Sequence, residues 1–329
     1  MEIKETVFTK RNEPYPPFET YFGNLSMGVL DIETTGLSPA SSQVILAGLL
    51  FPAPSGDGWI MKQYFAEDPR EEKVLLAALD EDYSPLDFVV TYNGRSFDLP
   101  FLEGRRKNLN LSPLPRRYNL DLYRLVRDFS DIGRFTPNLK QKTLERFLGL
   151  WKNRADEISG GESAGLYMDY LITGAADLKE KILLHNCDDV LQLYRLMGAL
   201  SRVDLHKAMY RSGFPLTLEE HKYIIQSIGL GKDRLQVKGV QITAPVKYVY
   251  YGDEFPHFRF SEDGFSFTVP TLSHKDLVLV DGRQLGVATV NAMEGYSVIK
   301  KSEEVNYSEI NLLVGLLLER IIKQWITKK

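Results

Sequence analysis

The segment from residue 27 to residue 37 constrains this chain more than any other. It is an apolar run of strand-forming residues that ends in two carboxylates, Asp31 and Glu33. Residues two apart on a strand point to the same face, so the two negative charges lie side by side. Like charges repel, and a bound cation removes that cost. The segment therefore predicts a Mg²⁺ or Mn²⁺ site at the end of a central strand. The alternative is a strand that reaches the surface at Asp31, with both acids in water.

The order of predicted elements indicates an α/β layered domain over residues 1–202. Residues 1–26 are polar and contain three prolines, so we expect them to be irregular. Three strands then form an antiparallel meander, and a helix, a fourth strand and several helices follow. The predicted strands cover residues 27–33, 43–51, 58–66 and 87–92, and the predicted helices cover residues 69–80, 98–108, 119–129, 139–149, 163–173 and 176–200.

The sequence pattern changes after Arg202, which predicts a second, α+β domain over residues 203–329. A helical pattern covers residues 204–227. Short runs rich in Val, Tyr, Phe and Thr follow between residues 235 and 299, and turn signals about every 10 residues predict antiparallel strands. Residues 307–328 are expected to form a terminal amphipathic helix. We expect this accessory domain to clamp substrate, mediate dimers or bind a partner, and its sequence does not decide among these roles.

The single cysteine, Cys187, excludes an intrachain disulfide and a cysteine-based zinc site. It fits a reducing cytoplasm, so we expect a cytoplasmic protein. The first residues lack the basic-then-apolar order of a signal peptide. The most apolar C-terminal run, residues 310–322, is too short to span a bilayer, so no membrane association is expected.

Positive charge is concentrated in one part of a chain whose net charge is −4. Residues 95–154 hold 14 Lys or Arg and 6 Asp or Glu. Such a stretch is either a footprint for a polyanion or a set of solvated helix faces. The candidates for phosphate contacts are Arg95, Arg105, Arg106, Lys107, Arg116, Arg117, Lys140 and Lys142. The nearby rings of Tyr92 and Tyr123 could stack on bases, although the core is the expected place for both.

Further candidate site residues lie downstream of Asp31 and Glu33. Asp98 stands where a predicted strand gives way to a helix, and capping that helix is its alternative role. His185 and Asp189 are four apart, so they share one face of a helix. Asp189 also falls on the apolar stripe of that helix, where a carboxylate needs a partner such as a metal.

Three other polar residues near these positions have simpler expected roles. Asp188 points about 100° away from Asp189 and is expected to be solvated. His185, taken alone, could be a hydrogen-bonded histidine that is partly buried. Asp121 opens a predicted helix, so capping is its expected role, and it is a reserve candidate for the site.

In order along the chain, these motifs resemble those of a known nuclease group. Asp31-Ile-Glu33-Thr-Thr-Gly, then Asn93-Gly-Arg-Ser-Phe-Asp98, then a late helix with His185 and Asp189 resemble the exonuclease motifs of the DEDD (DnaQ-like) group of the ribonuclease H-like superfamily. The YprB-type predicted exonuclease family is more similar still. It shares an Asp-Leu segment as at Asp121, a Leu-Lys-…-Thr-Leu-Glu segment as at 139–145, and a His-Asn-x-x-Asp-Val run as at 185–190. The resemblance covers roughly residues 20–200 and implies a ribonuclease H-like mixed sheet flanked by helices.

The resemblance implies a metal-dependent 3′→5′ exonuclease that acts on single-stranded DNA or RNA. Asp31, Glu33, Asp98 and Asp189 would hold two divalent ions, Mg²⁺ or Mn²⁺, about 4 Å apart. His185 would take a proton from the attacking water, although it stands four residues before Asp189, where this group usually has either Tyr at that spacing or His one residue earlier. Glu33 would also accept a hydrogen bond from the terminal 3′-hydroxyl. Thr34, Asn93 and Arg95 are the expected substrate contacts.

Two other classes of function fit the same sequence. The first is a nucleic-acid-binding module on this fold with weak or no catalysis, which the unusual spacing of His185 would favour. The second is a docking protein that uses residues 235–329 as its interaction surface.

Overall fold

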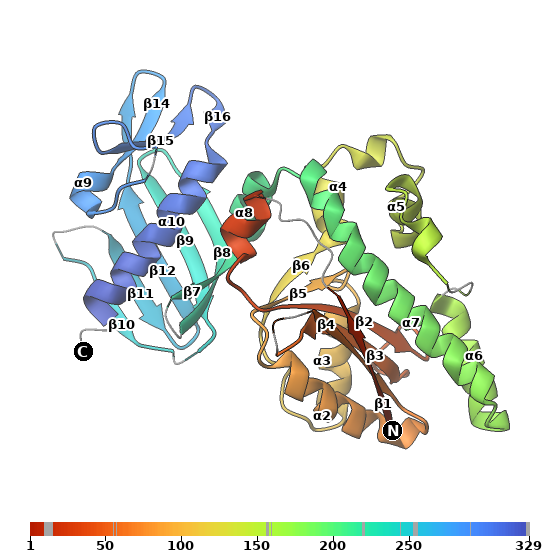
Figure 1. Ribbon diagram of the computed structural model, residues 1–329. Coiled ribbons are helices and arrows are strands. Elements are labelled where there is room, and N and C mark those ends of the chain that lie inside the picture. Colours follow the sequence, from red (N-terminus) through yellow and green to blue (C-terminus); the bar gives the residue numbers. More distant parts are fainter. Residues whose placement is uncertain are drawn as a thin grey trace. The chain divides into compact units, whose positions relative to one another are not determined.

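A computed structural model describes residues 1–9, 16–54, 56, 58–155, 158, 160–218, 221–243, 245–252, 256–289 and 291–326 (Figure 1). The chain folds into two compact units. Unit 1 consists of Met1–Pro16 and Asn24–Val203, and unit 2 consists of Pro17–Gly23 and Asp204–Lys329. A short N-terminal segment therefore belongs with the C-terminal part of the chain.

Unit 1 is built on a six-stranded mixed sheet in the order β1-β4-β3-β2-β5-β6. The strands are β1 (Glu2–Phe8), β2 (Met27–Thr34), β3 (Val44–Pro52), β4 (Trp59–Phe65), β5 (Phe88–Thr91) and β6 (Tyr118–Asp121). β2, β3 and β4 form the expected antiparallel meander, while β5 and β6 continue the sheet parallel to β2. The predicted α/β class, with a mixed sheet flanked by helices, is confirmed.

Helices cover both faces of this sheet (Figure 1). They are α2 (Glu72–Tyr83), α3 (Asp98–Asn108), α4 (Leu122–Phe129), α5 (Gln141–Phe147), α6 (Gly160–Thr173) and α7 (Ala176–Leu196). One face packs Leu30 and Ile32 of β2 against α2 and α3. The other face packs Ile45 and Leu46 of β3 against α6 and α7. Because side chains alternate along a strand, burial of Leu30 and Ile32 on the first face turns Asp31 and Glu33 toward the second.

The irregular lead-in predicted for residues 1–26 is wrong. Residues 2–8 form β1, which pairs antiparallel with β4 along the edge of the sheet. Four of its seven residues are charged or polar, and four of the seven are exposed. Such a composition is tolerated in an edge strand but does not by itself predict a strand. Residues 16–22 form helix α1 (Pro16–Phe22). Its Tyr21 hydroxyl lies 2.8 Å from Asn311 Nδ2 and 2.7 Å from His206 Nδ1, within unit 2.

Unit 2 combines two antiparallel sheets with a long helix. The first has the order β10-β11-β12-β9-β8-β7, and the second has the order β13-β14-β15-β16. α10 (Tyr307–Ile321) packs against α8 and β15. The remaining elements are α8 (Leu205–Ser212), β7 (Phe214–Leu218), β8 (His221–Leu230), β9 (Arg234–Gln241), β10 (Tyr248–Tyr250), β11 (His257–Ser261), β12 (Gly264–Pro270), β13 (Leu272–His274), β14 (Leu277–Asp281), α9 (Gly282–Leu285), β15 (Tyr296–Lys301) and β16 (Glu304–Val305).

The helix predicted for residues 204–227 ends early, at Ser212. Gly213 follows with a φ of +79°, and a Cβ there would lie 1.8 Å from the carbonyl oxygen of Ile225. The chain reverses at this glycine and continues as β7 and β8, which pair with each other. The expected antiparallel strands and terminal helix are present; α10 continues into a π-helical turn at Ile322–Ile326, and residues 327–329 lie outside the described residues. Across the described chain, every helix is too short or too polar to cross a membrane.

Candidate active site

Asp31 and Glu33, the two acids of β2, point from the sheet toward helix α7. Glu33 is buried and Asp31 is partly buried. From α7, His185 Nε2 lies 3.6 Å from Glu33 Oε1 and 3.4 Å from Asp189 Oδ2. One ligand atom from each of Glu33, His185 and Asp189 can be chosen so that all lie within 4.8 Å of one another. The i, i+4 spacing of His185 and Asp189 thus places both side chains over the acids of β2.

Asp98 reaches the same place from the neighbouring strand. β2 and β5 are parallel, so their carboxyl ends lie at the same edge of the sheet. The turn after β5 leads into α3, whose first residue is Asp98. The buried Asp98 carboxylate accepts a hydrogen bond from Ile32 N at 3.3 Å, between Asp31 and Glu33. Phe97 is the N-cap residue of α3. The alternative role expected for Asp98, as the cap of this helix, is therefore not observed.

Mutual repulsion shows that the four carboxylates form one electrostatic group. Burial and the charges of Asp189, Asp98 and Glu33 raise the pKa of Asp31 well above its ordinary value. Burial raises the pKa of Glu33 to about 7, with His185 opposing the shift and Asp189 adding to it. Burial also raises the pKa of Asp98 to about 7. Negative charge at this site is therefore costly near neutral pH unless a cation balances it.

Asn186 was not predicted as a site residue, yet it contacts the first acid directly. Its Nδ2 donates to Asp31 Oδ2 at 3.0 Å, and its Oδ1 accepts from Gln63 Nε2 at 3.1 Å. Gly48, the residue opposite Asp31 on β3, makes the approach possible. A Cβ on Gly48 would lie 2.2 Å from Asn186 Oδ1. The only sequence signal for this contact is that Asn186 follows His185.

Arg154 and Glu145 were not predicted as site residues, although Glu145 ends the 139–145 segment that resembles the YprB-type family. Arg154 Nη2 lies 2.5 Å from Asp189 Oδ1 and 2.7 Å from Glu145 Oε1, and Arg154 Nε donates to Glu145 Oε2 at 2.9 Å. Both side chains are almost completely buried, at 1% and 0% exposure. Gln141 Nε2 adds a hydrogen bond to the Asp189 carbonyl oxygen at 3.0 Å. These hydrogen bonds and ion pairs hold Asp189 to α5 and to the segment after it.

Asp121 takes the capping role expected of it and a second role in addition. It is the N-cap of α4, where its carboxylate accepts from Arg124 N at 3.4 Å. The same carboxylate accepts from Asn93 N at 2.9 Å and from Arg95 N at 3.2 Å. Asn93 has a φ of +64°, so this turn is in a conformation that needs support. Asp121 therefore shapes the turn that leads to Asp98.

The remaining predicted contacts differ in how they are held. The Thr34 hydroxyl donates to Gly36 O at 2.8 Å, which closes the turn after β2. Asn93 is half-buried and Arg95 is exposed, and the backbone N of each donates to Asp121. Asp188, which we expected to be solvated, is buried, and its carboxylate accepts a hydrogen bond from Ala155 N at 2.5 Å. The segment before α6 covers this side of α7, and that cover could not be read from helix periodicity.

Two of the proposed phosphate ligands are structural. Arg105 is buried and donates to both carboxylate oxygens of Glu72, and Arg106 is buried and donates to both oxygens of Asp80. Arg117 is half-buried and donates to Ser84 O. Of the other candidates, Arg95, Lys107, Arg116 and Lys140 are exposed, whereas Lys142 is half-buried and donates to Ile158 O at 2.5 Å. Only part of the basic stretch is thus available to a ligand.

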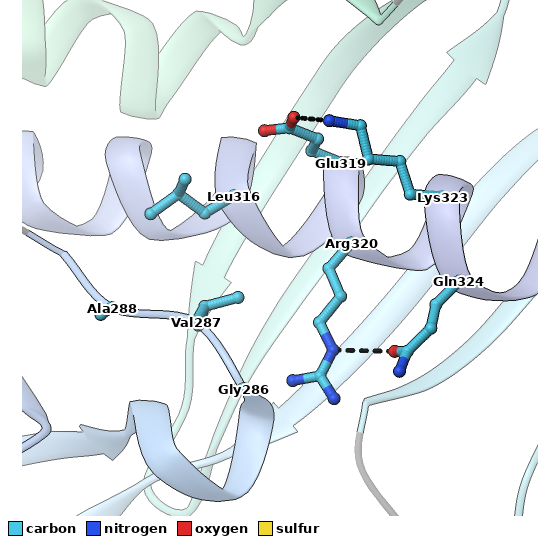
Figure 2. A pocket seen from close by; sticks show the side chains of 8 residues that line it. All are labelled: Gly286, Val287, Ala288, Leu316, Glu319, Arg320, Lys323 and Gln324. Carbon is cyan, nitrogen blue, oxygen red and sulfur yellow. Dashed lines mark hydrogen bonds and ion pairs between the residues drawn. The ribbon is translucent and has the colours of Figure 1, made fainter.

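Two cavities bear on where ligands could bind. One, of about 530 Å³, is in unit 1 and is lined by Tyr92, Asn93, Tyr123, Asn138, Leu139, Lys140 and Gln141. The other, of about 620 Å³, is in unit 2 between α10 and the segment after α9 (Figure 2). Arg320 and Lys323 line this second cavity, but each is engaged by a neighbour on the same helix, Gln324 and Glu319 respectively. The first cavity contacts the acidic site through Gln141, which lines it and donates to the Asp189 carbonyl oxygen.

Comparison with known proteins identifies the superfamily to which the chain belongs. The RNase_H_2 family model, described as the RNase_H superfamily, matches residues 29–201. That match spans more than half of the chain, and the chain therefore belongs to the RNase H superfamily. The ribonuclease H-like fold expected from the motifs is confirmed.

The chain is also similar to part of a solved polymerase structure. A family B DNA polymerase from the hyperthermophilic archaeon Pyrobaculum calidifontis matches with 19% sequence identity and a TM-score of 0.44. The match covers 54% of this chain but only 24% of the polymerase chain. No curated protein matches the chain.

Proposed function

We propose that this protein is a metal-dependent 3′→5′ exonuclease of the DEDD group, most similar to the YprB-type family, and that it hydrolyses single-stranded DNA or RNA. The observation that carries the proposal is the convergence of Asp31, Glu33, Asp98 and Asp189 around His185, from three separate segments of unit 1. Residues 1–202 are the proposed catalytic domain, and residues 203–329 are a proposed accessory domain.

The donor set fits divalent cations such as Mg²⁺ or Mn²⁺. Carboxylate oxygens are the preferred ligands of these ions, and raised pKa values show that the acids lack sufficient positive charge around them. Asp31, Glu33, Asp98 and Asp189 would hold the metal, with two ions as the proposed number. When bound, divalent ions lower the pKa of a water ligand and stabilise negative charge on the phosphate and the leaving oxygen.

The side chains of this site have distinct roles in the proposed hydrolysis. His185 Nε2, between Glu33 and Asp189, accepts the proton of the water that attacks the phosphorus. A new P–O bond forms to that water as the bond between phosphorus and the 3′-oxygen breaks. The leaving 3′-oxygen takes a proton from solvent, and His185 releases its own proton to solvent. Asn186 holds Asp31 through one carboxylate oxygen, while Arg154 holds Asp189. Each of these two contacts engages one carboxylate oxygen, Oδ2 of Asp31 and Oδ1 of Asp189.

Selection of a strand end would depend on Glu33 and on the turn after β5. Glu33 is at the bottom of the site and can accept a hydrogen bond from a terminal 3′-hydroxyl. Thr34, Asn93 and Arg95 are the proposed contacts for the adjoining sugar and phosphate. Arg95, three residues before Asp98, and Lys140, the residue before Gln141, are exposed cations suited to the backbone of a single strand.

A second candidate is a binding module with weak catalysis on the same fold. The observation that favours it is the ion pair between Arg154 and Asp189, which balances one of the four acids without a metal. Such a module would bind single strands but release no nucleotide.

The decisive experiment measures release of 5′-mononucleotides from single-stranded DNA and RNA labelled at the phosphate of the 3′-terminal nucleotide, with Mg²⁺ or Mn²⁺. We expect activity that chelation abolishes and that Asp31→Asn and Asp189→Asn reduce to the level of the buffer blank. Asp177→Asn is the matched control, because Asp177 is an exposed acid on the same helix as Asp189. Activity that survives Asp31→Asn or ignores chelation would refute the proposal, and binding without turnover would select the second candidate.

A further inference from the structure

The cavity of about 530 Å³ in unit 1 includes Asn93 and Lys140, which are proposed substrate contacts, but its aromatic residues have no role in the hydrolysis described above. Three separate segments line it. Tyr92 and Asn93 come from the turn after β5, Tyr123 comes from α4, and residues 138–141 lead into α5. Its volume lies in the range typical of sites for small ligands, about 300–1,000 Å³. The lining contains two aromatic rings, three carboxamides and one lysine, and none of its residues is acidic.

Two of the lining residues connect this cavity to the acidic site. Gln141 Nε2 donates to the carbonyl oxygen of Asp189, 3.0 Å away. Asn93 begins the turn that ends at Asp98, and its backbone N donates to Asp121. A strand with its scissile phosphate at the acids would therefore have its adjoining nucleotide within reach of the cavity.

The two tyrosine rings form a fixed aromatic wall. Their centroids are 5.8 Å apart and their planes meet at 63°, an edge-to-face pair. The Tyr92 hydroxyl donates to Leu139 O, which fixes the first ring to the opposite side of the cavity. Both tyrosines are partly exposed, whereas a pure core role would have buried them. This exposure corrects the expectation that the two rings belong to the core.

The polar groups around the rings favour a flat, uncharged, hydrogen-bonding ligand attached to an anion. Asn138 Oδ1 is engaged by Lys140 N and by the Thr143 hydroxyl, so its position is set by the backbone of the segment. The Lys140 side chain is exposed and can meet a phosphate at the rim. Aromatic faces bind nucleobases of any sequence by stacking, and amides add hydrogen bonds to base edges.

We propose that this cavity, with Tyr123 as its main contact, binds one nucleobase of the strand whose phosphate is at the acidic site. This inference rests on the proposed function, since it assigns the substrate of that function a second point of contact. It predicts that one position of the strand, and only one, depends strongly on the presence of its base.

The test uses the full chain and single-stranded 12-mers that carry one abasic residue at each of the last three positions in turn. Affinity is measured by fluorescence anisotropy with Ca²⁺, and KM for nucleotide release is measured with Mn²⁺. We expect one abasic position to weaken binding by about 10-fold, as the loss of one base stack does. Equal affinity for all the 12-mers would overturn the inference.

Variants of Tyr123 test whether the base at the sensitive position of the strand binds in the cavity. Tyr123→Ala and Tyr123→Leu should each weaken binding of the intact strand by about 10-fold, with no further loss at the sensitive abasic position. Tyr123→Phe should behave as wild type, because the ring remains. Phe135→Ala is the matched control, since Phe135 is a well exposed ring in the same unit that does not line the cavity.

The outcomes separate the two proposals. Additive losses from Tyr123→Leu and the abasic residue would overturn the nucleobase site even if cleavage is normal. Base-dependent binding without any nucleotide release would support the nucleobase site and overturn the exonuclease. Tyr123→Leu keeps an apolar side chain in place of the ring, so it guards against a variant that merely fails to fold.

Discussion

Arg154 donates from Nη2 to Oδ1 of Asp189 at 2.5 Å, and the same guanidinium forms a two-pronged pair with Glu145. One cation thus pairs with two carboxylates, of which Glu145 is completely buried and Asp189 is about one-fifth exposed. A buried ion pair stabilises little by its presence, but loss of one partner leaves an uncompensated buried charge. Arg154 therefore positions Asp189. Its loss is expected to destabilise unit 1.

Replacing Arg154 with methionine should destabilise the protein by about 3–5 kcal/mol, because Glu145 would remain charged and buried. The double variant Arg154→Met/Glu145→Gln should recover most of that loss, since no charge is then left without a partner in the pair. Urea unfolding of both variants measures the difference.

The control for this pair is Arg127→Met. Arg127 pairs with Asp128 at the surface, with both side chains about two-fifths exposed, so its loss should change stability far less than the loss of Arg154. A double variant as unstable as the single one would show that Arg154 stabilises through packing of its side chain rather than through its charge.

Local patterns in the sequence predicted the acids themselves. Alternation of apolar and acidic residues in 30–33 fixed which face of β2 carries Asp31 and Glu33, and the spacing of four joined His185 to Asp189. These periods are properties of the backbone, so they can be read from a few neighbouring residues.

Contacts between distant segments were out of reach of that reasoning. Arg154 stands 35 residues from Asp189 and looks like one more cation in a basic stretch. Burial of Asp188 depends on the same segment, whose Ala155 N covers it. β1 was missed for a related reason: an exposed edge strand carries the polar residues of a loop, and only its pairing with β4 identifies it.

The carboxylates of the site should make stability fall as pH rises in the absence of metal. Glu33 and Asp98 have folded-state pKa values of about 7, above the value of about 4 in an unfolded chain. Between these values the folded state holds more protons than the unfolded state, so the free energy of unfolding decreases with pH and levels off above about 7. Urea unfolding at pH 5 and pH 7.5 with a chelator measures this difference.

Two comparisons isolate the site in that experiment. Asp98→Asn removes one of the carboxylates with a raised pKa and should reduce the decrease. Mn²⁺ in place of the chelator should restore stability at pH 7.5, because an ion that binds only the folded state stabilises it. The same decrease in Asp98→Asn as in wild type would assign the pH dependence to other groups.

Gly48 should tolerate no side chain. Alanine there would bring a Cβ to 2.2 Å from Asn186 Oδ1 and force Asn186 away from Asp31. We expect a loss of about 1–3 kcal/mol in the free energy of unfolding, typical of a residue forced into a packed site. Gly165→Ala is the matched control: Gly165 is in helix α6 with nothing within 4 Å of an added Cβ, so stability should rise by about 0.5–1 kcal/mol. A neutral Gly48→Ala would show that α7 can withdraw from the sheet freely.

Asp121→Asn should separate the shape of the site from its ability to bind metal. Both Asp121 oxygens accept backbone hydrogen bonds from the turn at residues 93–95, and an asparagine can offer only one acceptor oxygen to that turn. Loss of a hydrogen bond to a charged group costs about 1.5–3 kcal/mol, and the φ of +64° at Asn93 then has less support. We expect reduced stability and a higher KM for single strands, because Asn93 and Arg95 are proposed substrate contacts.

Mn²⁺ affinity, measured by calorimetry, should change little if Asp121 is no ligand, whereas Asp98→Asn should weaken it strongly. A loss of Mn²⁺ affinity as large as that of Asp98→Asn would make Asp121 a fifth member of the acidic group.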